Sequence, residues 1–97
     1  MKLLIPKLVF FCLLTLNIQA RKIVSVQTGG WNNPSTWLHN YLPQGGDTIE
    51  VEVGHTVIVS GSHNLTGNKA VIIVRGVLSF NVNSHLSLPN GSSVAIS

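Results

Sequence analysis

The feature that most constrains this chain is a repeat of short Val- and Ile-rich segments. A strand-like run, a two-residue corner containing glycine and a second run occur at 49–59 and again at 71–82. Ile49, Ile72 and Val94 follow one another at nearly equal intervals. A period of roughly 20–25 residues indicates a solenoid, in which each unit stacks on the one before it. Because β-branched residues favour a pleated surface, the repeating unit is a coil of strands.

We therefore predict an all-β fold, a right-handed parallel β-helix with an N-terminal cap. The alternative is a small antiparallel β-sandwich, since two-residue corners also join hairpin strands. The corners Gly54-His55 and Arg75-Gly76 are not the Asn-Gly or Asp-Gly pairs that tight hairpins favour. Gly46, Gly54 and Gly76 are predicted turn positions, and Asp47 is predicted to accept hydrogen bonds from turn amides before the first regular strand.

The segment 1–20 has the three-part layout of a secretory signal peptide. Lys2 and Lys7 precede an apolar run at 8–16, and Ala20 supplies the small residue at the cleavage site. The run is too short to cross a bilayer, which takes ~20 apolar residues. We expect a secreted or cell-surface product with no membrane span after cleavage. The organisation predicted is a signal peptide at 1–20, a capping segment at 21–47 and solenoid coils at 48–97.

Charge and composition restrict the function. The region after Ala20 holds four Lys or Arg residues and three Asp or Glu residues. This near-neutral balance argues against nucleic-acid binding, which depends on many cations. Cys12 is the only cysteine and lies in the signal segment, so no disulfide is expected.

Evidence for catalysis in the sequence is weak. Glu50 and Glu52 stand two apart on one predicted strand, a spacing of roughly 7 Å that glycosidase carboxylates could use, but a solvated strand face explains them as well. The four histidines, at 39, 55, 63 and 85, match no short zinc spacing, although stacking could bring the second and fourth together. We expect no metal and no cofactor, and enzymatic activity of this chain alone is uncertain and leans to no.

The aromatic residues of the capping segment have two possible roles. They could cover the open end of the first coil, each burying ~150–250 Å². They could instead stack on sugar rings, with neighbouring amides as hydrogen-bonding groups. The candidate residues for either role are Trp31, Trp37, Tyr41, Asn32 and Asn33.

The same segment carries a resemblance. Gly30-Trp31, Ser35-Thr36-Trp37, Pro43 and Gly46-Asp47 precede Val/Ile strands. This pattern is similar to the N-terminal region of Bacteroidetes-type cell-surface β-helix proteins and to the eight-glycine β-solenoid domain, over residues 28–80. The resemblance implies a capping segment followed by coils. It also implies adhesive or carbohydrate-active regions elsewhere in the longer relatives.

The function expected is an exported structural or adhesive β-helix module of a cell-surface protein. The alternatives are a carbohydrate-binding module and the non-catalytic N-terminal part of a carbohydrate-active enzyme. The partners expected are glycans or downstream domains of the same protein, because the strand pattern at 94–97 has no terminating cap and a C-terminal truncation is expected. Weak glycosylation motifs occur at Asn64, Asn90 and Thr48.

Overall fold

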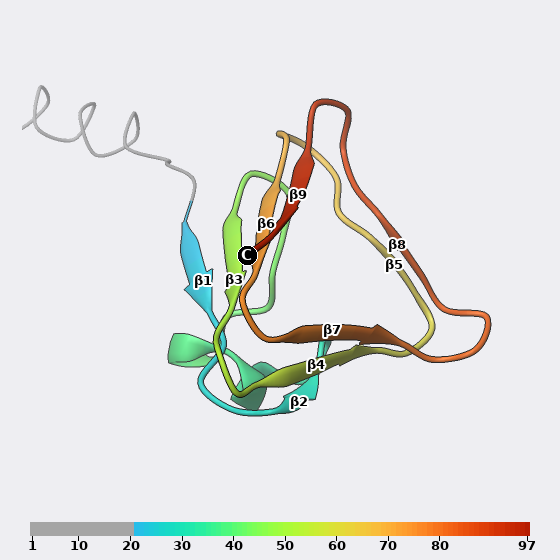
Figure 1. The fold of residues 1–97 in the computed structure, drawn as a ribbon. Helices are drawn as coiled ribbons and strands as arrows, with labels where there is room; N and C mark the ends of the chain where they lie inside the picture. Colours follow the sequence, from blue (N-terminus) through green and yellow to red (C-terminus); the bar gives the residue numbers. More distant parts are fainter. Residues whose placement is uncertain (1–20) are drawn as a thin grey trace, which may run out of the picture.

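The chain winds into a right-handed coil of about three turns with a triangular cross-section (Figure 1). The computed structural model describes residues 21–97, and the predicted signal peptide lies outside the described residues. Every pairing between the named strands is parallel, which confirms the predicted β-helix. The antiparallel sandwich is therefore wrong. Within residues 21–97 there is no α-helix.

Each face of the triangle is one parallel sheet. The first face stacks β1 (Lys22–Val24), β3 (Thr48–Val51), β6 (Val71–Val74) and β9 (Ser93–Ile96). The second stacks β2 (Gly29–Gly30), β4 (Thr56–Val59) and β7 (Val77–Phe80). The third holds β5 (Ser62–Asn64) and β8 (His85–Ser87). Two 3₁₀ turns, η1 (Pro34–Thr36) and η2 (Leu38–Asn40), belong to the cap.

The register of the first face follows the sequence period. Ile49 pairs with Ile72, and Ile72 with Val94. Ile23 stands before Ile49 in the same row. The three isoleucines have no exposed surface. Burying a side chain of this size contributes roughly 1.5–3 kcal/mol, so this inward column is a large part of the core.

Three local features go beyond the sequence pattern. The segment 21–47 is more than a cap, because β1 and β2 supply the strands of a first coil. The polar run at 61–69 contains β5 and so forms part of the third face. Val53 continues the alternation of Ile49 and Val51 in the sequence, yet it is 75% exposed. The strand ends before it, and the chain turns through Gly54 with a φ of 85°.

Candidate binding groove beside the cap

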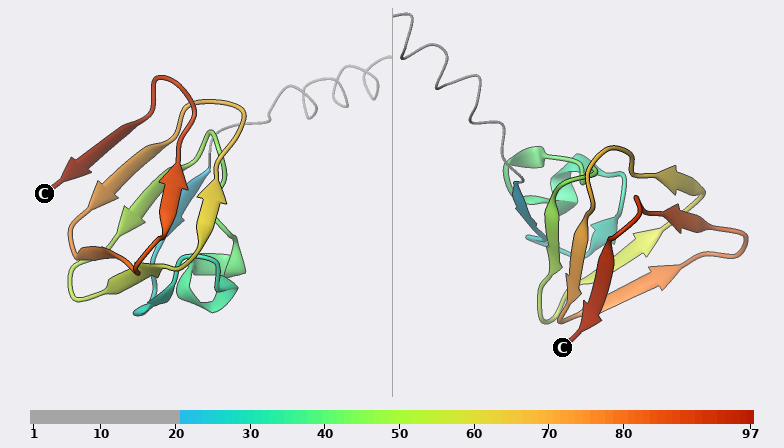
Figure 2. Two further views of the ribbon diagram at one scale, coloured as in Figure 1. Left: turned by 90° about the vertical axis from the view of Figure 1, so that its right-hand side faces the viewer. Right: turned by 90° about the horizontal axis from the view of Figure 1, so that it is seen from above.

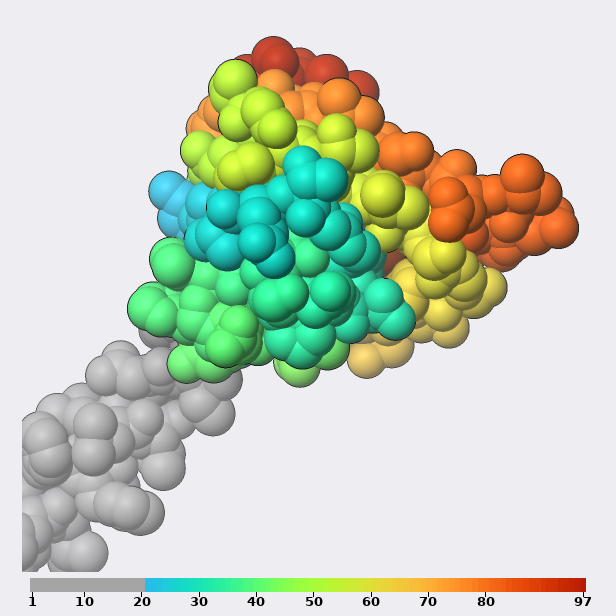
Figure 3. All heavy atoms as spheres, turned by 90° about the horizontal axis from the view of Figure 1, so that it is seen from below, coloured from blue at the N-terminus to red at the C-terminus, as the bar shows by residue number. Residues whose placement is uncertain are grey.

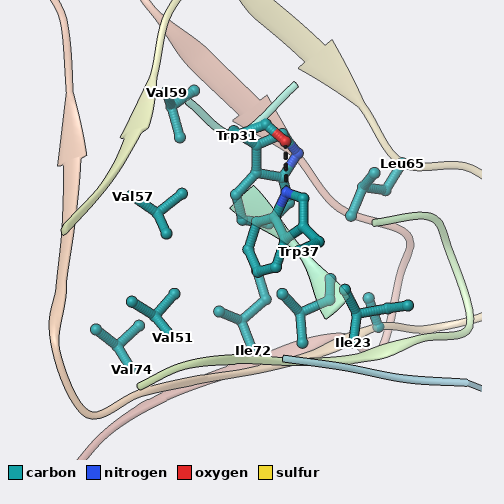
Figure 4. Close-up of a cluster of buried hydrophobic side chains, with 11 residues drawn as sticks. Ile23, Trp31, Trp37, Val51, Val57, Val59, Leu65, Ile72 and Val74 are labelled. Carbon is teal, nitrogen blue, oxygen red and sulfur yellow. Dashed lines mark hydrogen bonds between the residues drawn. The ribbon is translucent and has the colours of Figure 1, made fainter. Parts of the chain in front are cut away.

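The two tryptophans of the cap lie inside the molecule. Trp31 is 2% exposed and Trp37 is 1% exposed. Their rings meet edge to face, with centroids 5.5 Å apart and an interplanar angle of 80°. The indole Nε1–H of Trp37 donates to the backbone carbonyl of Trp31 at 2.9 Å (Figure 4). Both rings therefore close the N-terminal end of the core, and neither presents a face on which a sugar could stack.

The exposed aromatic of the segment is Tyr41, at 47%. The guanidinium carbon of Arg21 lies 4.8 Å from its ring centroid, a cation–π geometry. Arg21 Nη2 also contacts Asp47 Oδ2 at 3.1 Å. Asp47 is buried and accepts a hydrogen bond from the backbone N–H of Gln44 at 2.9 Å. This cluster ties the end of the cap to the start of β1 and β3.

The third face begins one strand later than the other two. β1 and β2 precede β3 and β4 on their faces, but β5 has only β8 beside it. Leu65 N–H donates to the carbonyl of Ser87, and His85 N–H donates to that of Gly61. Because bonding alternates along a parallel ladder, the backbone polar groups of Ser62 and Asn64 point away from β8, toward the cap.

A groove runs along this free edge of β5. One part, of about 240 Å³, is lined by Trp31, Asn32, Leu42, Pro43 and residues 62–65. An adjoining part, of about 270 Å³, is lined by residues 43–45 and 64–66. Figure 3 shows the cap, in teal and green, beside the yellow segment that contains β5. The side chains around the groove are amides, hydroxyls, an imidazole and apolar groups, with no formal charge. We refer to it as the cap groove.

The two asparagines proposed as sugar contacts have different positions. Asn32 is exposed and lines the cap groove. Asn33 is the N-cap of η1, and its side-chain oxygen accepts hydrogen bonds from the backbone N–H of Ser35 at 3.1 Å and from the Ser35 hydroxyl at 2.9 Å. Asn33 therefore serves the cap, and Asn32 remains available to a ligand. The free edge of β5 was missed from sequence, because its segment reads as a polar loop.

The carboxylate pair of β3 is a structural cluster. Glu50 is 6% exposed, so the expectation of a solvated face is wrong for this residue. Arg75 Nη1 donates to Glu50 Oε1 at 2.6 Å and to Glu52 Oε2 at 3.2 Å, and Lys22 Nζ lies 3.3 Å from Glu50 Oε2. The hydrogen bond from Arg75, followed by Lys22, holds the pKa of Glu50 below its ordinary value and outweighs desolvation.

A Ser–His contact that the sequence did not reveal lies at the corner after β3. Ser25 Oγ is 2.8 Å from His55 Nδ1 and accepts a hydrogen bond from the backbone N–H of Glu52 at 2.9 Å. The hydroxyl proton then points to Nδ1 when the imidazole carries its own proton on Nε2. Ser25 is 3% exposed, which withholds its oxygen from a substrate. The pair joins the first coil to the second and stabilises the corner after β3.

The four histidines do not form a cluster. His55 lies at the β3–β4 corner, while His85 begins β8 on another face and pairs with Ser62. His63 Nε2 bonds the carbonyl of Ser60 at 2.8 Å, and His39 stands beside Tyr41. Among residues 21–97, no group of three His, Cys, Asp or Glu side chains is placed to hold a metal ion.

The remaining predicted positions are turns and glycosylation sites. Gly46 and Gly54 have φ values of 90° and 85°, whereas Gly76 is required by a close approach to the preceding coil. Asn64 is exposed in the cap groove, and Asn90 is exposed in the corner between β8 and β9. Thr48 is half-buried at the start of β3. No helix among the described residues is both long and apolar enough to cross a bilayer.

Fold and site together define a parallel β-solenoid with a sealed N-terminal end and a polar groove beside the seal. No family model, curated protein or solved structure matches the chain. The resemblance to cell-surface β-helix proteins over residues 28–80 therefore stays a prediction.

Proposed function

We propose that this chain is a structural and adhesive β-solenoid module of an exported cell-surface protein. Export is supported by the sequence at 1–20, with its cationic start, apolar run and Ala20. A structural role is supported by the buried carboxylates, which form ion pairs between coils. Asp47 is paired with Arg21 and Glu50 with Arg75, so these groups hold coils together.

The observation that carries the adhesive part of the proposal is the cap groove. It lies on a rigid frame, since its floor is β5 and one wall is the buried Trp31. Rigid walls reduce the entropy cost of binding. Unpaired backbone groups of Ser62 and Asn64 add donors and acceptors at fixed positions.

The chemistry of the groove favours a neutral, hydroxyl-rich ligand, and carbohydrate binding is the second candidate function. Amide and hydroxyl groups donate and accept hydrogen bonds, as sugar hydroxyls require. A strongly anionic or cationic ligand would find no opposite charge among the lining residues. In this proposal the tryptophans support the groove from behind, and hydrogen bonding replaces ring stacking as the main contact.

The test is a glycan array probed with the protein produced from residues 1–97, followed by titration of any glycan that binds. Asn32→Ala and Asn64→Ala should each weaken binding by about tenfold, equivalent to one hydrogen bond of ~1.4 kcal/mol. Asn90→Ala is the matched control, since Asn90 is an exposed amide outside the groove. Binding that survives both groove variants would overturn the assignment of the groove. Detection of the protein in the cell interior with residues 1–20 still attached would overturn export.

A further inference from the structure

The free edge of β5 is short. β8 lies on one side of β5, and Figure 2 (left) shows the cap, in teal and green, toward its other side. Because bonding alternates along a parallel ladder, Ser62 and Asn64 are the β5 residues whose backbone N–H and C=O groups point into the cap groove. Beyond Asn64 the edge is closed, since Gly45 lies so near the Thr66 carbonyl that any side chain at Gly45 would collide with it. An extended peptide pairs with a longer row of edge groups, so this edge suits a single amide group instead.

The cap supplies polar groups on the other side of the groove. Asn32 is exposed and lines the same part, of about 240 Å³, as Ser62 and Asn64. Its side chain offers a carbonyl acceptor and an NH₂ donor. A ligand in this part of the groove therefore meets hydrogen-bonding groups from two elements, the backbone of β5 and the side-chain amide of the cap.

A small apolar surface lies beside these polar groups. Leu42 lines the groove and is 38% exposed, whereas Trp31 and Pro43, which also line it, are buried. The apolar area offered to a ligand is therefore centred on one leucine side chain. With no formal charge among the lining residues, the site fits a neutral group that combines an amide with a methyl-sized apolar end.

We propose that the cap groove selects sugars that carry an acetamido group, the neutral N-acetylated hexosamines. This inference rests on the proposed carbohydrate-binding function and names the ligand class of the same groove. An acetamido group has the planar amide of a peptide bond, so its N–H and C=O point in opposite directions. Its C=O accepts a hydrogen bond from the backbone N–H of Asn64, and its N–H donates to Asn32 Oδ1. Its methyl group packs against Leu42.

The same chemistry excludes three related kinds of sugar. A plain hexose has a hydroxyl in place of the acetamido group, which spans a shorter distance and brings no methyl group. A deacetylated amino sugar brings an ammonium, and an acidic sugar brings a carboxylate. Neither charge would find an opposite charge among the lining residues, and burying it unpaired is costly.

The first experiment uses the protein produced from residues 1–97 and three tetrasaccharides of the same linkage, built of N-acetylglucosamine, glucose or glucosamine. Isothermal titration calorimetry should give an affinity at least about tenfold higher for the N-acetylated tetramer, because the other two lose at least one hydrogen bond. Equal affinity for the glucose tetramer would overturn the acetamido assignment and leave carbohydrate binding in place. A glycan array that shows binding only to glycans without acetamido groups would do the same. An array with no bound glycan would overturn both proposals.

The second experiment tests the backbone contact. Asn64→Ala and Asn64→Pro both remove the side-chain amide, but only proline also removes the N–H. Proline is tolerated at an edge position whose N–H is outside the ladder, so the strand should still form, which circular dichroism checks. Asn64→Pro should bind the N-acetylated tetramer about tenfold more weakly than Asn64→Ala. Equal binding by the two folded variants would overturn the contact to the Asn64 N–H.

The third experiment tests the methyl contact. Leu42→Ser should weaken binding of the N-acetylated tetramer several-fold and leave binding of any plain hexose chain unchanged, because only the acetamido methyl packs against Leu42. Leu38→Ser is the matched control: Leu38 is also an exposed leucine of the cap, at 43%, but it does not line the groove. An unchanged affinity in Leu42→Ser, or an equal loss in Leu38→Ser, would overturn the placement of the methyl group.

Discussion

A methyl group added at Gly76 is a direct test of how the coils stack. Gly76 lies in the corner between β6 and β7, directly above the corner of the coil before it. A Cβ there would lie 2.3 Å from the carbonyl oxygens of both Glu52 and His55. Both atoms are backbone, so no side-chain rotation relieves the contact. Gly76 N–H also donates to the backbone carbonyl of Val51 at 3.1 Å, and Val77 N–H donates to the backbone carbonyl of His55 at 2.9 Å.

The cost of Gly76→Ala follows from that geometry. Real Cβ contacts essentially never fall below 3.0 Å, so the two coils must move apart locally before the methyl group fits. Overpacking of this kind costs typically ~1–3 kcal/mol. The separation also stretches two hydrogen bonds, each with a net value of ~1 kcal/mol. We expect a loss of about 3 kcal/mol, from a total of ~4–12 kcal/mol for a domain of this size.

Urea unfolding followed by circular dichroism measures the effect. With a slope of ~1 kcal/mol per molar urea, the midpoint of Gly76→Ala should fall by about 3 M. Gly30→Ala is the matched control, because the nearest atom to its Cβ is 3.7 Å away. That variant should be neutral or gain up to ~1 kcal/mol from a less flexible unfolded chain. Equal midpoints for the two variants would refute the stacking argument.

Three further predictions address the ion cluster, the cap and a buried hydroxyl. Because Arg75 lowers the folded-state pKa of Glu50, this ion pair stabilises the protein at pH values above the ordinary carboxyl pKa of 4.5, and the stabilisation is lost as the pH falls below it. The urea midpoint of Glu50→Gln should therefore drop less between pH 7 and pH 3 than that of the unaltered protein. Trp37→Ala should destabilise by ~3–5 kcal/mol, and Trp37→Phe by less, since Phe fills part of the cavity but cannot donate to Trp31; thermal melts compare them. The Thr36 hydroxyl is buried with no hydrogen-bond partner among the described residues, so Thr36→Val should be neutral or raise the melting temperature by a few degrees.

The register of the solenoid could be predicted from the sequence because one kind of residue, β-branched and aliphatic, repeats at one position in each coil. Ile49, Ile72 and Val94 occupy the same inward row, and their spacing equals the length of one turn. In a parallel stack a slip of one residue would turn every apolar side chain outward. The period therefore carries nearly all the information about this face.

The third face could not be predicted, because its first strand has too few apolar residues. β5 spans only Ser62–Asn64, and Leu65 is the one buried apolar residue of the run at 61–69. A period of two needs at least two inward apolar residues to be seen. The cap groove was missed for the same reason, since it is defined by the free edge of β5.

The burial of Glu50 also lay beyond sequence reasoning. Glu50 alternates with inward-facing residues on β3, and this alternation correctly predicts that it lies on the outer face of the sheet. Its cover comes from Lys22 in the coil before it and from Arg75 in the coil after it. Only the stacking of three coils brings these groups together. The same stacking placed Ser25 against His55, although the two are far apart in the sequence.

The stacking of the coils also affects where charged side chains can stand on the first face. Residues one turn apart lie directly over one another, so a charge repeated in every coil would stack on itself and repel. Around Glu50 the chain places opposite charges instead, with Lys22 from the coil before it and Arg75 from the coil after it. β9 (Ser93–Ile96) carries no charged side chain. The last strand is therefore held without ion pairs, by apolar stacking, backbone pairing and neutral hydrogen bonds such as that from the Ala70 N–H to Ser92 Oγ at 2.8 Å.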